Sequence, residues 1–437
     1  MSINTVAMEA PASQKVNLQA WLNWTLAVAF VVFVFTFQTG YAITNVDMTA
    51  KLSLTVVQVG IIGSIYTWAF AIAQFASGSI LDRLGMRWVI PIACSVVTLG
   101  GFVFANATGT GMLIAGQMLM AIGGSFGFVG AGFVGGKWFG PAKYGLMFAW
   151  VQFVASFAAL LGQNVLGDLA AMYSWDQLLN GLSFVGLVVT ILLFVLMRSP
   201  PTEEKAEPWQ GVESFVKSLV EHINDVCAIS DSWINALIGG ATFGSMLALG
   251  VVWGPRFLVA GGMEQSEAFG VSAMMWLGLA IGAPIFAWVS DRMRKRRLPM
   301  AMGCFLQLLA ILYIIANPGM SVQGASIAFF IWGFMAGGSM LNFPIGAELV
   351  KPSLVGTSAA VVNAVQFIVG GILMAIPGQV LSGSGPIARF AGITTEKAIL
   401  NPTISDYQWA IAVIPLALCG ALLLFIFLRE TYPEQGE

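Results

Sequence analysis

Long apolar stretches limit the folds open to this chain more than any other feature of its sequence. Segments of about 20 apolar residues, enough to cross the hydrocarbon of a bilayer as helix, recur from end to end. Lipid cannot hydrogen-bond an exposed backbone, so each segment is expected to be helical. A β-barrel would instead require short segments of alternating polarity. We predict an all-α membrane protein with twelve transmembrane helices, at 20–45, 56–81, 88–106, 111–136, 144–167, 178–197, 232–258, 268–290, 298–316, 322–347, 355–380 and 407–428.

The amino-acid composition supports this interpretation. The chain is 58% hydrophobic and 9% charged, whereas soluble domains carry about 25% charged residues. So few charges cannot cover a water-facing surface of this size. The polar N-terminal segment, up to Gln19, has no apolar stretch followed by a small-residue cleavage site, so the first span is expected to direct the chain to the membrane. We expect a multi-pass protein of a bacterial inner (cytoplasmic) membrane.

The basic residues predict the orientation in the membrane. With twelve spans and a cytoplasmic N-terminus, all but four of the 19 Lys and Arg residues fall on the cytoplasmic side, as the positive-inside rule requires. The exceptions are Lys51, Arg256, Arg389 and Lys397. The reverse orientation would place the basic majority outside, so both termini are expected in the cytoplasm.

A long polar break divides the spans into two sets of six. In the linker, apolar residues between Val212 and Ile223 recur with helical spacing, which predicts an amphipathic helix. The pattern fits a helix on the membrane surface as well as a linker helix packed on the bundle. The expected organisation is a cytoplasmic tail at 1–19, a six-helix bundle at 20–197, a cytoplasmic linker at 198–231, a second six-helix bundle at 232–428 and a cytoplasmic tail at 429–437.

The two halves resemble each other. Asp82-Arg83 ends the second span and Asp291-Arg292 ends the eighth, while Gly145 follows the fourth span and Gly356 the tenth. Nearly the same offset separates the two Asp-Arg pairs and the two glycines. This indicates an internal duplication, and duplicated halves with a shared central site are typical of secondary transporters.

The segment GSILDRLGMR, residues 78–87, resembles the signature loop between the second and third helices of the major facilitator superfamily. The loop's pattern of Gly, three residues, Asp-Arg, one residue and Gly falls on Gly78, Asp82, Arg83 and Gly85. A half-copy begins at Asp291. The resemblance extends over nearly the whole chain and implies two pseudo-symmetric six-helix bundles around a central cavity.

The same resemblance implies a latch between the halves on the cytoplasmic side. Gly85 permits a tight reversal of the chain. Asp82, at a helix end, can accept hydrogen bonds from the N-terminus of a neighbouring helix and interact with its dipole. The basic residues fit a simpler role as well, which is to fix the topology. The candidate gating residues are Asp82, Arg83, Gly85, Arg87, Asp291 and Arg292.

Two departures from the family pattern bear on the direction of transport. Many proton-coupled members carry an Arg in the fourth span, where this chain has Gln117. Many drug antiporters carry a Gly-Pro motif in the fifth span, which reads SFAALLGQNVLG here. Both departures argue against drug/proton antiport and favour uptake or facilitated exchange.

Ionisable residues are rare at mid-membrane depth, so amides and aromatic residues must supply most contacts to a solute. Amides offer donors and acceptors, which suits a neutral or zwitterionic solute, although each could equally hold two helices together. Arg256, near the outer end of the seventh span, fits binding of a carboxylate or phosphate or contact with lipid headgroups. The candidate substrate-binding residues are Gln38, Tyr41, Gln117, Gln152, Trp253, Arg256, Asn342, Asn363 and Gln366.

The sequence offers no constellation suited to catalysis. The one histidine, His222, lies in the linker, and the four cysteines have no metal-ligand spacing. We therefore expect a protein that is not an enzyme, with no catalytic residue, no cofactor and no metal. The net charge of −2 and the lack of a basic soluble domain argue against a nucleic-acid partner.

These features together predict a secondary transporter that works by alternating access. The expected cargo is a small polar organic solute, such as an amino acid, nucleoside, sugar or organic anion. Uptake is favoured, with protons as a candidate coupling ion, and the alternative is an exporter of drugs or siderophore-like metabolites on the same fold. The expected partners are the solute and membrane lipid, and the protein is expected to be a monomer.

Overall fold

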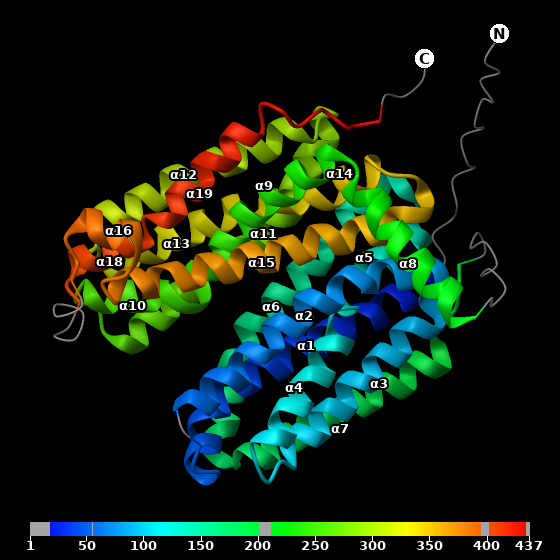
Figure 1. The fold of residues 1–437 in the computed structure, drawn as a ribbon, viewed down its shortest axis with the longest axis horizontal. Coiled ribbons are helices and arrows are strands. Elements are labelled where there is room, and N and C mark those ends of the chain that lie inside the picture. Colours follow the sequence, from blue (N-terminus) through cyan, green and yellow to red (C-terminus); the bar gives the residue numbers. More distant parts are fainter. Residues whose placement is uncertain (1–17, 55, 201–210, 395–401, 434–437) are drawn as a thin grey trace.

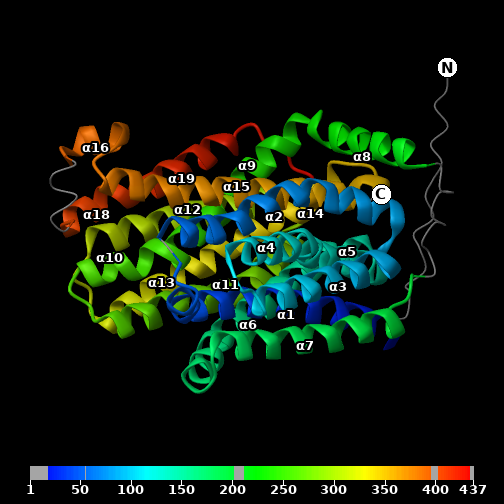
Figure 2. The same ribbon diagram turned by 60° about the horizontal axis from the view of Figure 1, so that its bottom comes forward.

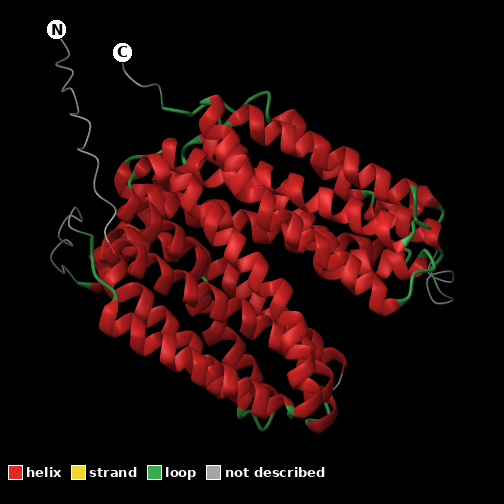
Figure 3. Ribbon diagram, turned by 180° about the vertical axis from the view of Figure 1, so that it is seen from behind, coloured by secondary structure: helices red, strands yellow, loops and turns green. Residues whose placement is uncertain are grey.

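The described chain folds into two helical bundles, and helix α8 lies between them in the sequence (Figure 1, Figure 3). The computed structural model describes residues 18–54, 56–200, 211–394 and 402–433. The first bundle contains α1 (Leu18–Lys51), α2 (Val56–Leu84), α3 (Met86–Ala105), α4 (Thr110–Gly124), α5 (Gly127–Phe139), α6 (Tyr144–Met172) and α7 (Trp175–Leu196).

The second bundle repeats this arrangement with more interruptions. It contains α9 (Ser230–Leu247), a π-helical turn (Ala248–Trp253), α10 (Gly254–Ala260), α11 (Gln265–Met293), α12 (Arg297–Ala316), α13 (Val322–Ala336), a 3₁₀ segment (Gly337–Leu341), α14 (Asn342–Glu348), α15 (Val355–Leu381), α16 (Gly385–Ala391), α18 (Ile404–Ile411) and α19 (Val413–Leu424).

The predicted class of fold, an all-helical membrane protein with two six-helix bundles, is confirmed. In the part of the chain that the structure describes, eleven helical segments are long and apolar enough to cross a membrane. The 29-residue helix α2 packs between α4 and α15 and is the twelfth span. Exposed Leu, Ile, Phe and Val side chains are frequent on α7, α12 and α19, as expected where lipid is the solvent.

The bundles converge at one end of the molecule and diverge toward the other (Figure 1). The first residues of α1, the described C-terminal segment up to Pro433 and α8 (Val212–Cys227) lie at the convergent end, which we call the terminus side. The bundles meet there through α2 with α15 and through α6 with α11. The packing of the bundles therefore closes the terminus side and leaves the opposite side open.

Several of the described spans are interrupted part-way across the membrane, and three of these breaks contain or adjoin glycines. A turn separates α4 from α5, a π-helical turn separates α9 from α10, and a 3₁₀ segment separates α13 from α14. Glycines lie at all three breaks, and Pro255 follows the second. Irregular backbone is tolerated at membrane depth only where protein or a cavity covers it, so these breaks point to the interior between the bundles.

The linker helix α8 lies across the terminus-side ends of both bundles (Figure 2). It packs against α2 of the first bundle and α15 of the second. Arg83 donates to the carbonyl oxygens of Ser214 (3.5 Å) and Phe215 (3.4 Å) on α8. Val216 and Val220 on the same helix are half exposed. The helix thus packs on the bundles and still presents apolar residues outward.

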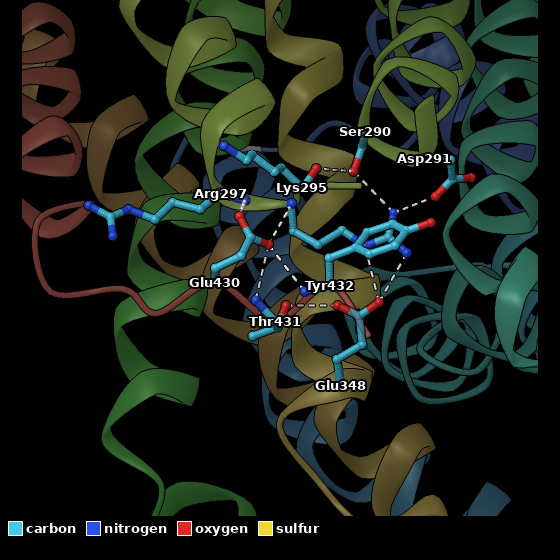
Figure 4. Close-up of polar contacts among 9 residues, drawn as sticks. Ser290, Asp291, Lys295, Arg297, Glu348, Glu430, Thr431 and Tyr432 are labelled. Carbon is cyan, nitrogen blue, oxygen red and sulfur yellow. Dashed lines mark hydrogen bonds and ion pairs between the residues drawn. The ribbon is translucent and has the colours of Figure 1, made fainter. Parts of the chain in front are cut away.

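A buried arginine braces the terminus side of the second bundle (Figure 4). Arg296 is 5% exposed and pairs with Asp291 at 2.6 Å and with Glu348 at 3.0 Å. Glu430 accepts the Arg296 backbone N–H at 2.7 Å, and Thr431 donates its hydroxyl to Glu348 at 2.7 Å. The network joins the end of α11, the end of α14 and the C-terminal segment.

The charge of Arg296 is secured by its neighbours. Burial lowers the pKa of the guanidinium, but the carboxylates of Glu348 and Asp291 outweigh burial and raise the pKa above its ordinary value. Arg296 therefore stays protonated, and both carboxylates keep a charged partner.

Replacing this arginine should destabilise the protein. In Arg296→Met, two carboxylates lose their buried partner, so the free energy of unfolding should fall by about 3 kcal/mol. Thermal unfolding in detergent should show a clearly lower Tm. The exposed neighbour Arg292, changed to Met, is the matched control. Equal Tm values for the two variants would contradict a bracing role for the network.

Candidate functional site

A cavity of about 710 Å³ lies between the two bundles. Side chains of α1, α2, α5 and α6 line it from the first bundle, and side chains of α9, α11 and α15 line it from the second. Gly124 and Gly127 at the break between α4 and α5, and Gly250 and Pro255 at the break between α9 and α10, contribute to its wall. The interrupted spans therefore do border the interior.

Polar groups reach the cavity from both bundles. They belong to Gln38, Tyr66 and Gln152 on one side and Ser272, Asn363 and Gln366 on the other. Two of these residues carry a buried atom that has no hydrogen-bond partner in the described structure, namely Ser272 Oγ and Gln366 Nε2. Buried polar groups normally find a partner, so these atoms are suited to bind a polar solute or water.

Aromatic rings make up much of the remaining wall. Such rings suit the apolar faces of a solute, because they offer large contact areas at low cost in side-chain entropy. Phe70 and Phe367 touch across the bundles with ring centroids 4.8 Å apart. The rings that line the cavity are those of Phe35, Tyr66, Phe70, Phe128, Phe243, Phe269, Trp276 and Phe367.

Charge is lacking from this wall. Among the described residues that line the cavity, none has an ionisable acidic or basic side chain. Outside the cavity, Lys51 forms ion pairs with both Asp47 and Asp176, at the ends of α1 and α7 that lie away from the terminus side. The cavity can therefore satisfy hydrogen bonds and apolar contacts, but it supplies no formal countercharge.

Four of the nine sequence-predicted binding residues line the cavity, namely Gln38, Gln152, Asn363 and Gln366. Tyr41 instead packs edge-on against Phe104 inside the first bundle, with ring centroids 5.6 Å apart. Gln117 is 3% exposed in α4 and does not line the cavity. Both face their own bundle, because sequence position alone does not reveal which way a helix is turned.

The other three predicted residues lie within or near the second bundle. Asn342 and Asn235 exchange hydrogen bonds between side-chain amide and backbone oxygen, at 2.6 and 2.8 Å, and so join α14 to α9. Trp253 donates its indole N–H to the Met374 carbonyl at 2.9 Å. Arg256 is exposed and lies over the Trp253 ring at 5.3 Å, next to the cavity-lining Pro255.

Sequence reasoning missed Tyr66, Ser272 and most of the aromatic wall. The signal for the rings was weak, because phenylalanine is frequent on lipid-facing and core-facing surfaces alike in this chain. The glycines and Pro255 at the helix breaks carried a better signal, since broken helices mark binding sites in secondary transporters.

Between the cavity and the terminus side, α2 and α15 form a close antiparallel contact that we call the α2–α15 seam. On α2 it comprises Phe70, Gln74, Gly78 and Asp82, which share one helix face at intervals of four residues. Gly78 permits the contact, because a Cβ there would lie 2.6 Å from the Ala360 Cβ. On α15 the seam comprises Phe367, Asn363, Ala360, Gly356 and Thr357.

Asp82 closes the seam at the terminus side. Its carboxylate accepts the backbone N–H groups of Gly356 (2.9 Å) and Thr357 (2.7 Å) and the Thr357 hydroxyl (2.9 Å). These donors stand in the first turn of α15, where backbone N–H groups have no partner within the helix and the dipole attracts a negative charge. The contact joins the two bundles directly.

The other predicted gating residues lie around this contact in different roles. Gly85 has a φ of 73° and forms the turn into α3. Arg87 lies over the Trp88 ring at 4.5 Å. Asp291 pairs with Arg296 inside its own bundle, and Arg292 is exposed. The repeated Asp-Arg motif therefore makes a cross-bundle contact at Asp82 and an internal contact at Asp291.

The chain is similar to known membrane transport proteins. The family model described as Major Facilitator Superfamily matches residues 25–375. The probable galactarate/D-glucarate transporter GudP of Escherichia coli is 21% identical over 78% of this chain and 82% of its own length. Sugar phosphate exchanger 3 of Bos taurus is 24% identical over 71% of this chain and 70% of its own.

A solved structure shows the same fold. The fucose:proton symporter FucP of E. coli superposes with a TM-score of 0.64 at 16% identity, over 93% of this chain and 99% of its own. At this identity the likeness bears on the fold alone.

A bulky residue at position 78 should hold the seam apart. In Gly78→Leu the side chain would collide with Ala360 and the backbone of Gly356, so the closed arrangement cannot form. Spin labels on exposed Lys143 and Lys351, one in each bundle at the terminus side, should report a longer distance. Gly181→Leu, where a Cβ meets open space, is the control. An unchanged distance in Gly78→Leu would show that this contact does not limit closure.

Proposed function

The chain belongs to the major facilitator superfamily, and we propose that it takes up a small neutral or zwitterionic polar solute by alternating access. The observation that carries this proposal is the cavity between the bundles, where amides and hydroxyls from both halves meet aromatic rings and none of the described lining side chains is charged. A solute bound there would touch both bundles, so its binding can respond to their relative movement.

The character of the wall restricts the solute. Burying an ion without a countercharge costs far more than burying a hydrogen-bonded neutral group. The names of two relatives specify sugar acids or sugar phosphates, which are anions, whereas the name of the structural neighbour specifies fucose, which is neutral. The uncharged wall favours a neutral solute for this chain, with hydroxyl or amide groups on one face and an apolar surface on the other.

The proposed transport cycle uses the two ends of the molecule in turn. The excess of basic residues supports a cytoplasmic position for the terminus side, and in this proposal the cavity therefore faces outward. Separation of the α2–α15 seam, together with approach of the bundles at the opposite end, would open the cavity inward. Asp82 is the latch in this scheme, because its hydrogen bonds to α15 exist only while the terminus side is closed.

Removing the latch should favour the inward-open form. In Asp82→Ala, the backbone N–H groups of Gly356 and Thr357 lose their acceptor in the closed form but can bind water in the open one. The loss of about 2 kcal/mol should raise the inward-open fraction at least tenfold, measured by the distance between labels at Lys143 and Lys351. Asp225→Ala, on the exposed surface of α8, should leave the distance unchanged. A closed terminus side in Asp82→Ala would rule out the latch.

A binding screen followed by uptake tests the proposed cargo. The Tm of the purified protein should rise with solutes of zero net charge from a panel of L-fucose, amino acids with uncharged side chains, and nucleosides. It should not rise with D-glucarate or a hexose phosphate. Proteoliposomes should then accumulate the stabilising solute, and Gln366→Leu should weaken the uptake. Repeating the assay with an imposed pH gradient shows whether protons move with the solute. Stabilisation by the anions alone would refute the neutral-solute proposal.

A further inference from the structure

One hydrogen bond in the α2–α15 seam connects the cavity with the contact between the bundles. The Asn363 side-chain amide on α15 donates to Gln74 Oε1 on α2 at 2.9 Å. Gln74 is fully buried and Asn363 is 3% exposed, yet Asn363 also lines the cavity. Among the described residues, Asn363 alone combines cavity lining with a hydrogen bond to the opposite bundle.

The Gln74 amide is held in one orientation by its own helix. The Ser77 hydroxyl donates its proton to the backbone carbonyl oxygen of Gln74 at 2.9 Å, so the Ser77 oxygen is left to accept. It accepts from Gln74 Nε2 at 2.8 Å. The side-chain oxygen of Gln74 is thereby turned to the other bundle, where it needs a donor. Asn363 Nδ2 is the donor that the structure supplies.

The Asn363 amide has capacity left for a ligand. One of its two N–H groups is engaged with Gln74, and no described residue donates to its Oδ1. A polar solute in the cavity can therefore reach an acceptor and a second donor on the same amide. The group that would contact the solute is the group that ties the bundles together.

The position of this bond in the seam gives it influence over closure. On the same face of α2, it lies one helical turn closer to the terminus side than the Phe70–Phe367 contact, and two turns farther from the terminus side than Asp82. To open the terminus side, the bundles must part at Gln74 and Asn363 as well as at Asp82. Both amides then lose their partner at a depth where few other polar groups are available.

We propose that the Gln74–Asn363 hydrogen bond holds the empty protein closed at the terminus side, and that a solute bound to Asn363 releases it. The second half of this statement rests on the proposed function. When the seam parts, an acceptor on the solute can take over the N–H of Asn363 that Gln74 gives up. An empty cavity offers no such replacement, so the empty protein changes state less readily than the loaded one.

The expected size of the effect follows from the value of one buried hydrogen bond. A net contribution of about 1 kcal/mol corresponds to about a fivefold change in the ratio of closed to open protein. Such a bias slows the opening of the empty protein at the terminus side. The return of the empty protein to the closed form re-forms the hydrogen bond and is not slowed.

The first experiment needs no solute. Labels at Lys143 and Lys351 report the inward-open fraction of purified, ligand-free protein. Gln74→Leu and Asn363→Leu each leave a buried amide unpaired in the closed form, so each should raise the inward-open fraction about fivefold. Gln152→Leu is the matched control, because Gln152 lines the same cavity but donates to Ser156 on its own helix at 2.8 Å. It should leave the fraction unchanged.

The double variant separates this specific bond from general damage. With both amides replaced by leucine, neither amide is left unpaired, Ser77 keeps its hydrogen bond to the backbone carbonyl of residue 74, and the two apolar side chains meet in the closed form. The inward-open fraction should return to the wild-type value or below it, although the double variant carries more changes than either single one. The proposal would be overturned if the single variants had the same inward-open fraction as Gln152→Leu. It would also be overturned if the increases in the two single variants added in the double variant.

The second experiment tests release by the solute. Addition of the neutral panel, L-fucose with uncharged amino acids and nucleosides, should lengthen the distance between the labels in the wild type. It should have little effect in Asn363→Leu. If the panel leaves the wild type unchanged while the single and double variants behave as expected, the neutral-solute class is refuted and the holding role of the bond stands. If the single variants do not open, the proposal fails whatever the panel does.

Discussion

The close approach of α2 and α15 is the constraint on which the rest of the architecture depends. It requires a glycine at position 78, where a side chain would collide with Ala360, and it brings Asp82 to the first turn of α15. With this contact in place, the two bundles converge at the terminus side and must diverge at the other. The cavity is the space that this divergence leaves between them.

The interrupted helices contribute to the wall of this cavity. A continuous transmembrane helix satisfies its own backbone and can offer a solute only side chains. The breaks at 125–126, 248–253 and 337–341 interrupt the regular α-helix, and all three border the cavity. The first two contribute Gly124, Gly127 and Gly250 to its wall, and the third contributes Met340. Small residues at these points also let the opposite bundle and a solute approach closely. The wall is thus assembled where the helices are least regular.

The sequence predicted the fold well because a bilayer permits few alternatives. Apolar length gave the spans, and the spacing of Asp82 from Asp291 indicated the duplication. The site was harder to predict, because lining a cavity depends on helix rotation. Gln38 and Gln152 face the cavity, whereas Gln117 and Asn342, equally plausible as amides in apolar helices, face their own bundles. The partner of Asn363 could not be foreseen either, since Gln74 is distant in sequence and their pairing depends on how the bundles dock.

Two of the described contacts between the bundles differ in physical character. At the α2–α15 seam the described structure has hydrogen bonds at Asp82 and at Asn363. Where α6 meets α14, Phe148 stacks on Phe343 with centroids 4.3 Å apart, and Gly145 packs on Pro344. Apolar packing of this kind is non-directional and tolerates sliding, whereas a buried hydrogen bond is lost once its partners separate. A polar seam opposite an apolar one therefore allows the bundles to pivot about the rings while the hydrogen bonds set the threshold for opening.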